Sequence, residues 1–308
     1  MTDLEYGRFE ALTFDCYGTL IDWEAGILAG LRRVLGPRSI EPPDNELLEA
    51  HAGFEAAAEA GPYAPYREIL GSCLIDVAAR YAVEPSPDEA AAFGDSVGLW
   101  PAFPDSAHAL ARLATRFRLG VLTNCDDDLF ARSEGRLGLT FDWVVTAQSV
   151  GSYKPDPRNF EALIARLGIP PNRILHVAQS LFHDHVPAKA MGLTTVWIDR
   201  RHDRPGSGAT PPTAPVRPDA TFADMATFVA AAVPGGRGAC WGARGARRAR
   251  GAGGAEGAGR GARDPVSLDR LPESSRKTPR HRPQGFASPS TRSPHGQRLR
   301  SVAAEPRR

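Results

Sequence analysis

The feature that most constrains the fold is the segment Phe14–Leu20, which reads Phe-Asp-Cys-Tyr-Gly-Thr-Leu and directly follows the apolar run Ala11–Thr13. Leu12 and Phe14 are two residues apart, as side chains on one face of a strand are, and Gly18 allows an abrupt turn of the backbone. The pattern predicts a strand that presents the carboxylate of Asp15 at the carboxyl edge of a sheet, where open α/β folds bind ligands. Such a carboxylate can act as a nucleophile, whereas a lone Asp beside Gly more commonly caps a turn.

Three later segments favour the nucleophile over the turn cap. They are Leu119–Asn124, Tyr153–Pro157 and Leu175–Asp184, and each places polar side chains just after an apolar strand or at the entry to a helix. With Asp15 they give an ordered set of a nucleophile, a hydroxyl with an amide, a lysine and an acidic loop. In this order the chain resembles the haloacid dehalogenase superfamily, over about residues 9–228.

The residue two positions after the nucleophile separates the chemistries of that superfamily. The resemblance implies a second Asp there in phosphatases, where it protonates the leaving oxygen and helps to hold magnesium; this chain has Tyr17. A phenol with a pKa of about 10 is a poor proton donor to an alkoxide at neutral pH. The segment therefore resembles the type II (L-2-haloacid) dehalogenase branch, which uses no metal and no other cofactor.

The fourth segment agrees with a reaction that needs no metal. Magnesium-dependent relatives begin this loop with an acidic residue, because a hard dication needs anionic oxygens; here Gln179 stands first and Asp184 is the one acidic residue left. His183 and His185 flank Asp184, and a solvated helix start is the alternative interpretation of these three residues.

The resemblance implies a two-step displacement. Asp15 would attack the carbon that bears the halogen and form an ester, and water would then attack the ester carbonyl. Lys154 would keep Asp15 ionised and stabilise the negative charge during hydrolysis. The supporting residues expected from the motifs are Thr19 and Thr123 as hydrogen-bond donors, Tyr17 and Asn124 beside the substrate or departing halide, and Asp184 with Gln179 or Ser180 to orient water.

Two departures leave the substrate open. Dehalogenases of this branch have an arginine in the second helix after the first motif, but Glu46–Glu55 contains none, and an expected tyrosine is Phe160. Arg32, His51 and Arg67 are candidates to replace the arginine. Three functions stay open: a metal-independent hydrolase of a small 2-haloalkanoic acid, a magnesium-dependent phosphatase of the same fold, and a binding protein that has lost turnover.

The rest of the chain predicts an α/β fold with a helical insertion. Apolar residues at helical spacing between Asp22 and about Pro101 predict a cap that excludes water from Asp15. Strands and helices then alternate, which predicts a doubly wound parallel sheet with helices on both faces. The expected strands are Arg118–Thr123, Trp143–Thr146, Ile174–Val177 and Thr194–Ile198, and the expected helices are Asp128–Leu137, Pro157–Leu167 and Asp184–Met191.

Composition divides the chain into three parts. Residues 9–21 and 101–233 form the expected Rossmannoid catalytic core, residues 22–100 the cap, and residues 234–308 a basic, disordered tail. From Gly235 onward there are 17 Lys and Arg against 5 Asp and Glu, a net charge of +12, while residues 1–234 carry a net charge of −11. A basic tail can bind nucleic acid or fold back on the acidic part, or it can be an unselected extension; of these, nucleic-acid binding is least favoured.

The remaining sequence signals concern location and partners. There is no apolar run of about twenty residues, and Met1–Glu5 does not begin a secretory signal, so we expect a cytoplasmic protein without membrane association. The four cysteines Cys16, Cys73, Cys125 and Cys240 have no CxxC spacing, which favours free thiols. The expected partner is a small carboxylic acid substrate, and a homodimer is left open.

Overall fold

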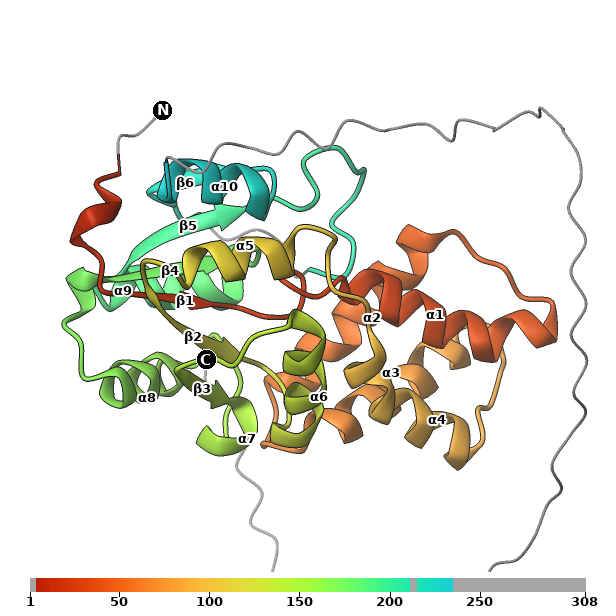
Figure 1. Cartoon of the computed structure of the whole chain (residues 1–308). Coiled ribbons are helices and arrows are strands. Elements are labelled where there is room, and N and C mark those ends of the chain that lie inside the picture. Colours follow the sequence, from red (N-terminus) through yellow and green to blue (C-terminus); the bar gives the residue numbers. More distant parts are fainter. Residues whose placement is uncertain (1–3, 211–214, 235–308) are drawn as a thin grey trace, which may run out of the picture. The chain divides into compact units, whose positions relative to one another are not determined.

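Six parallel strands form the centre of the fold, in the order β3-β2-β1-β4-β5-β6 (Figure 1). The order confirms the predicted doubly wound α/β sheet. Because β1 lies between β2 and β4, the chain winds outward from it in both directions, and the carboxyl end of β1 is the switch point at which such sheets bind ligands. The strands are β1 (Ala11–Phe14), β2 (Arg118–Thr123), β3 (Trp143–Thr146), β4 (Ile174–Ala178), β5 (Thr194–Ile198) and β6 (Ala220–Phe222).

The structure is a computed structural model and describes residues 4–210 and 215–234. All of these fall within one compact unit. The predicted basic tail, residues 234–308, lies outside the described residues except for its first residue. Within the described part, no helix is both long enough and apolar enough to cross a membrane.

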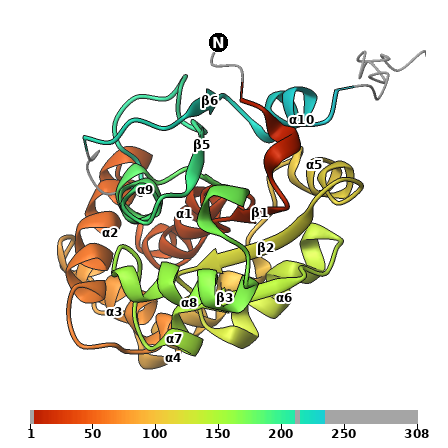
Figure 2. The same cartoon turned by 90° about the vertical axis from the view of Figure 1, so that its left-hand side faces the viewer.

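Helices cover both faces of the sheet because the strands are apolar on both sides. On one face, α5 (Ser106–Leu113) and α10 (Met225–Ala232) pack with Leu12 and Phe14 of β1 in one hydrophobic cluster. On the other, α8 (Pro157–Leu167) and α9 (Val186–Ala190) pack in a second cluster that includes Ala11. Figure 2 shows α5 and α10 side by side, away from α8. Burial on both faces is expected of a parallel sheet.

Four helices are inserted between β1 and α5. They are α1 (Trp23–Leu35), α2 (Asp44–Glu59), α3 (Tyr66–Ala79) and α4 (Pro87–Gly94), followed by the 3₁₀ turn η3 (Asp95–Leu99). We call α1–α4 the helical insert; its helices pack against one another and lie together beside the sheet in Figure 1. Since the insert begins directly after the β1 loop, it stands at the carboxyl edge of the sheet. The exact domain boundaries at residues 22 and 100 stay a prediction.

The remaining elements follow the predicted alternation, with two differences. Helices α6 (Asp127–Leu137) and α7 (Ala147–Val150) flank β3. Three short 3₁₀ turns lie elsewhere in the described part of the chain: η1 (Tyr6–Arg8), η2 (Gly36–Arg38) and η4 (Pro171–Arg173). The predicted helix Asp184–Met191 is instead a π-helical turn, η5 (Leu181–His185), followed by α9, where Pro187 removes a backbone donor. Strand β6 was not predicted, because three residues are too short to show periodicity.

Candidate active site

Asp15 lies directly beyond the end of β1, where the backbone still pairs with β4. Its backbone N–H donates to the carbonyl of Val177 at 3.1 Å, so the main chain is fixed up to the Asp15 side chain. The residue is only 6% exposed. Gly18, three positions on, has a φ of +92°, a conformation that favours glycine, and it turns the chain back beneath the carboxylate.

The ammonium of Lys154 joins two carboxylates. Its Nζ donates to Oδ1 of Asp15 and to Oδ1 of Asp184, each at 2.8 Å. A third hydrogen bond, to the carbonyl of Leu122 at 3.1 Å, uses the remaining donor of the ammonium. All three ionised side chains are buried. The structure therefore brings together three of the four residues predicted to be catalytic.

Thr19 is the fourth, and it holds the other oxygen of Asp15. The Thr19 hydroxyl donates to Asp15 Oδ2 at 2.7 Å and accepts a hydrogen bond from the backbone N–H of Gln179 at 2.9 Å. Both carboxylate oxygens of Asp15 are therefore held by donors. The loop after β1 and the loop after β4 are linked through one hydroxyl.

Asp184 is oriented by a residue to which the sequence analysis assigned no role. Nε2 of His176, on β4, lies 3.0 Å from Asp184 Oδ1, and Nδ1 lies 2.9 Å from the hydroxyl of Thr13 on β1. Because a carboxylate can only accept, Nε2 carries the proton. Asp184 itself lies in the π-helical turn and is fully buried, which rules out the solvated helix start as its environment.

The two carboxyl groups that share Lys154 have different proton affinities. Burial raises the pKa of Asp15, and the charge of Asp184 adds to this effect, against the opposing influence of Lys154 and Thr19. Burial also opposes ionisation of Asp184, but Lys154 and the His176 hydrogen bond outweigh it and hold its pKa well below the usual range. Burial alone would lower the pKa of Lys154; the two carboxylates raise it above its ordinary value instead.

The helical insert contributes two carboxyl groups to the site that the sequence patterns did not indicate. Glu55 and Glu59 lie one turn apart on α2. Tyr66, on α3, donates its hydroxyl to Glu55 Oε1 at 2.7 Å. Burial raises the pKa of Glu55 to about 7, and burial followed by repulsion from Glu55 raises that of Glu59 well above its ordinary value. Their four-residue spacing was the available signal, but it is common on exposed helix faces as well.

Two predicted substrate-binding residues do not make the contacts expected of them. The hydroxyl of Tyr17 lies 2.9 Å from that of Ser133 and accepts from the Cys125 thiol at 3.4 Å, so only the ring faces the cavity. Thr123 was expected to bond a carboxylate oxygen. Its buried hydroxyl has no partner among the described residues, and it does not line the cavity.

The other three predicted binding residues line the cavity, as Tyr17 does. Asn124 donates its amide to Glu59 and to the backbone carbonyl of Lys154, so its hydrogens are already used within the protein. The amide nitrogen of Gln179 donates to Thr210, and the Ser180 hydroxyl accepts from the backbone N–H at the start of η5.

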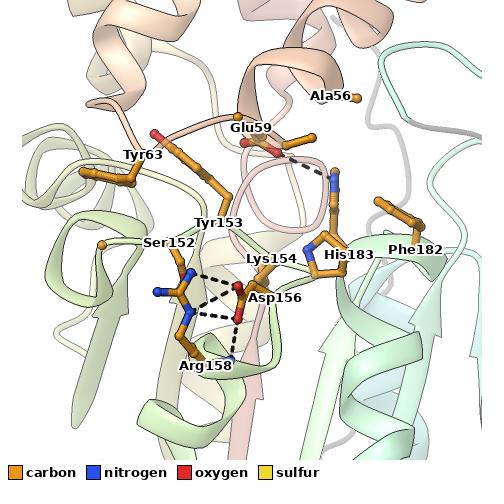
Figure 3. A pocket seen from close by; sticks show the side chains of 14 residues that line it. Ala56, Glu59, Tyr63, Ser152, Tyr153, Lys154, Asp156, Arg158, Phe182 and His183 are labelled. Atoms are coloured by element: carbon orange, nitrogen blue, oxygen red, sulfur yellow. Dashed lines mark hydrogen bonds and ion pairs between the residues drawn. The ribbon is translucent and has the colours of Figure 1, made fainter. Parts of the chain in front are cut away.

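A small cavity lies between Asp15 and the helical insert. Its volume is about 30 Å³, close to the space that one water molecule occupies. It adjoins an outer cleft of about 500 Å³, and the two share Glu59, Lys154 and His183 as lining residues. Figure 3 shows Glu59 and His183 facing one another across the cleft, with Oε2 of Glu59 3.7 Å from Nε2 of His183. The cavity is lined by Asp15, Tyr17, Trp23, Glu55, Glu59, Tyr66, Asn124, Lys154, Gln179, Ser180, His183 and Asp184.

The arrangement does not fit a magnesium ion of the phosphatase kind. Lys154 Nζ occupies the position between the carboxylates of Asp15 and Asp184 that a cation would take. The phenol of Tyr17 is directed to Ser133, and the side chain of Gln179 to Thr210, so neither side chain offers an oxygen to a shared ion.

The three candidates to replace the missing arginine do not reach the cavity. Arg67 pairs with Asp95, Asp126 and Asp128, and Arg32 pairs with Asp44 on the edge of the insert. His51 is buried in the insert, where burial lowers its pKa to about 4. The carboxylate clamp expected from the resemblance is therefore absent from the described residues that line the cavity.

Comparison with known proteins identifies the family. A family model described as haloacid dehalogenase-like hydrolase matches residues 9–192. (S)-2-haloacid dehalogenase 4A of Burkholderia cepacia is 25% identical over 199 residues, covering 63% of this chain and 85% of that protein. Phosphoserine phosphatase of Thermus thermophilus is 32% identical over 154 residues, covering 48% and 59%.

Solved structures agree on the fold. The L-2-haloacid dehalogenase from Xanthobacter autotrophicus superposes with a TM-score of 0.62 at 20% identity, over 72% of this chain and 97% of that one. Since the family model spans more than half of the chain, the protein belongs to the haloacid dehalogenase-like hydrolase family.

Proposed function

We propose that this hydrolase cleaves the carbon–halogen bond of a small 2-haloalkanoic acid or a close derivative, without a metal ion, through an ester on Asp15. The observation that carries the proposal is the Lys154 ammonium, which is 2.8 Å from both Asp15 and Asp184 at the carboxyl edge of the sheet. It keeps a buried carboxylate ionised with no metal, and no proton donor stands two residues after Asp15.

In the first step, an Asp15 oxygen attacks the carbon from the side opposite the halogen. A carbon–oxygen bond forms as the carbon–halogen bond breaks, and the halide departs with the bonding pair. Halide is a stable anion, so the step needs no general acid, which suits the placement of the Tyr17 phenol away from Asp15. Burial leaves the nucleophile poorly solvated and therefore more reactive.

In the second step, water attacks the ester carbonyl of Asp15. Oδ2 of Asp184 is buried without a partner among the described residues, and Asp184 lines the cavity, so this oxygen can accept a hydrogen bond from the attacking water. Lys154 stabilises the oxyanion that forms on the ester, and one proton of the water passes by way of Asp184 to solvent. The bond between the Asp15 carbonyl carbon and the alkoxide oxygen then breaks, the alkoxide takes the second water proton and leaves as the alcohol, and Asp15 is regenerated as a carboxylate with one oxygen from water.

The substrate would reach Asp15 from the outer cleft, which shares Glu59, Lys154 and His183 with the cavity as lining residues.

The proposal is tested by halide release from L-2-chloropropionate, its amide and monochloroacetate, with chelator present. A generic phosphate ester with magnesium is assayed in parallel. Halide release with chelator supports the proposal. Phosphate release with no halide from any of the compounds would instead favour the phosphatase alternative.

A further inference from the structure

The acidic groups that line the cavity outnumber the basic ones. Four carboxyl groups line it, from Asp15, Asp184, Glu55 and Glu59, against one lysine. The lining histidine, His183, adds no positive charge at neutral pH, because burial lowers its pKa to about 4. Two of the carboxyl groups belong to the sheet edge and two to α2 of the insert, so a bound substrate would contact carboxyl groups on both sides.

All three hydrogen-bond donors of the Lys154 ammonium already have partners. Lys154 donates its three hydrogens to Asp15, Asp184 and the Leu122 carbonyl. No arginine and no second lysine lines the cavity within the described part of the chain. A negatively charged group on the substrate would therefore have to compete with Asp15 or Asp184 for the ammonium.

Both carboxyl groups of the insert accept hydrogen bonds from neutral side chains. The side-chain amide of Asn124 donates to Glu59 at 3.3 and 3.2 Å, and the Tyr66 hydroxyl donates to Glu55 at 2.7 Å. Both contacts are made by uncharged donors. Glu59 faces the outer cleft as well as the cavity, so a donor on the substrate can reach it from outside.

A second feature, independent of the insert, is a carboxylate oxygen that needs a hydrogen-bond donor, which is the attacking water in the second step and can be a substrate N–H in the first. Oδ2 of Asp184 is buried and has no partner within the residues described, although the same side chain lines the cavity. A buried carboxylate oxygen without a donor is unfavourable, and it is satisfied when water or a ligand supplies one.

We infer that the cavity selects a substrate whose group beside the reacting carbon is an uncharged hydrogen-bond donor, best fitted by a primary carboxamide, rather than a carboxylate. This inference rests on the proposed displacement at Asp15. A carboxamide can donate to an ionised Glu55 or Glu59, and its carbonyl can accept from a protonated one. A carboxylate can only accept, and it adds a negative charge beside Asp15 and Asp184, which share the one counter-charge of Lys154.

The first experiment compares matched pairs with the complete protein. Halide release is measured with 2-chloropropionamide and 2-chloropropionate, and Asp15→Asn corrects for non-enzymatic loss. Binding of the unreactive isobutyramide and isobutyrate to the unaltered protein is measured by calorimetry. We expect kcat/KM and affinity to favour each amide by about tenfold or more.

The outcomes separate the two proposals. A preference for the acid in either pair overturns the inference while leaving the displacement reaction intact. If neither chloride is hydrolysed, the proposed function fails, and the calorimetry still decides the inference: tighter isobutyramide supports it, whereas tighter isobutyrate or no binding of either overturns it.

Two variants test whether the carboxyl groups of the insert cause the preference for the amide. In Glu55→Gln and Glu59→Gln the size of the side chain is kept, and each should lower the amide-to-acid ratio of kcat/KM by about tenfold, since the glutamine amide can donate to a carboxylate. Glu68→Gln is the matched control, because Glu68 is exposed on α3. If both cavity variants keep the ratio of the control, Glu55 and Glu59 do not select the substrate and the inference is wrong.

Discussion

The Lys154 ammonium lies 2.8 Å from the Asp15 carboxylate although 139 positions separate the two residues. Both are almost completely buried, so the pair is held in surroundings where an unpaired charge is costly. The same ammonium donates to Asp184, so one cation holds both carboxylates. This geometry and its surroundings lead to five predictions.

Asp15→Asn should abolish turnover and leave the fold intact. An amide has nearly the size of a carboxylate, but its neutral oxygen is a far weaker nucleophile. Asp76→Asn, on the exposed side of α3, is the control and should keep full activity. A single turnover in heavy-oxygen water, followed by mass measurement of the peptide that contains Asp15, should find the label on Asp15. Label only in the product, together with an active Asp15→Asn, would mean that water attacks directly.

Activity should fall on the acid side at a pH above the ordinary aspartate value of about 4. Burial raises the pKa of Asp15, so the carboxylate takes up a proton earlier as the pH decreases, and only the ionised form attacks carbon. Single-turnover rates of ester formation measured between pH 4 and 8 check this. A rate that stays constant down to pH 4 would contradict the raised pKa.

Lys154→Met should be inactive and less stable by about 3–5 kcal/mol, because it leaves two buried carboxylates without their cation. Adding Asp184→Asn should restore part of the stability but not the activity, since one of the two charges is then removed. Lys189→Met is the control: Lys189 pairs with Asp219 near the surface, where an ion pair contributes about 0–1 kcal/mol. Urea unfolding of the three variants and the unaltered protein gives the comparison, and equal losses of stability for the two lysine variants would refute the prediction.

Chelator should not change the rate of halide release. Lys154 Nζ stands between the carboxylates where a cation would bind, and the side chains of Tyr17 and Gln179 are directed elsewhere. Activity lost on chelation and restored by magnesium would show that a metal ion takes part in the reaction.

Gly26→Ala should destabilise the protein by about 1–3 kcal/mol, as overpacked sites do. A Cβ at this position of α1 would lie 2.2 Å from Trp100, whose ring packs edge-on against Tyr17 at 5.8 Å. Gly53→Ala on α2 meets nothing within 4 Å and should instead stabilise by up to about 1 kcal/mol through helix propensity. Thermal unfolding of the pair measures this; a stabilised Gly26→Ala would show that Trp100 moves freely.

Much of the fold was predictable because its signals are local. The strand before Asp15, the alternation of strands and helices after Leu110 and the helical spacing between residues 22 and 100 each depend on neighbours in the sequence. In a parallel sheet the carboxyl ends of the strands meet at one edge, so the order of the motifs also indicated that Asp15, Lys154 and Asp184 would converge.

Sequence patterns alone therefore predict the sheet, the position of the insertion and the family that the motifs resemble. The contacts of the side chains come from the folded structure: the Tyr17 phenol bonds Ser133, His176 orients Asp184, and Glu55 and Glu59 line the same cavity as Asp15. A sequence pattern reports contacts within about one helical turn or between alternate strand residues. The direction of a side chain toward a distant element depends on how the insert packs over the sheet, and that is set by long-range burial and charge pairing.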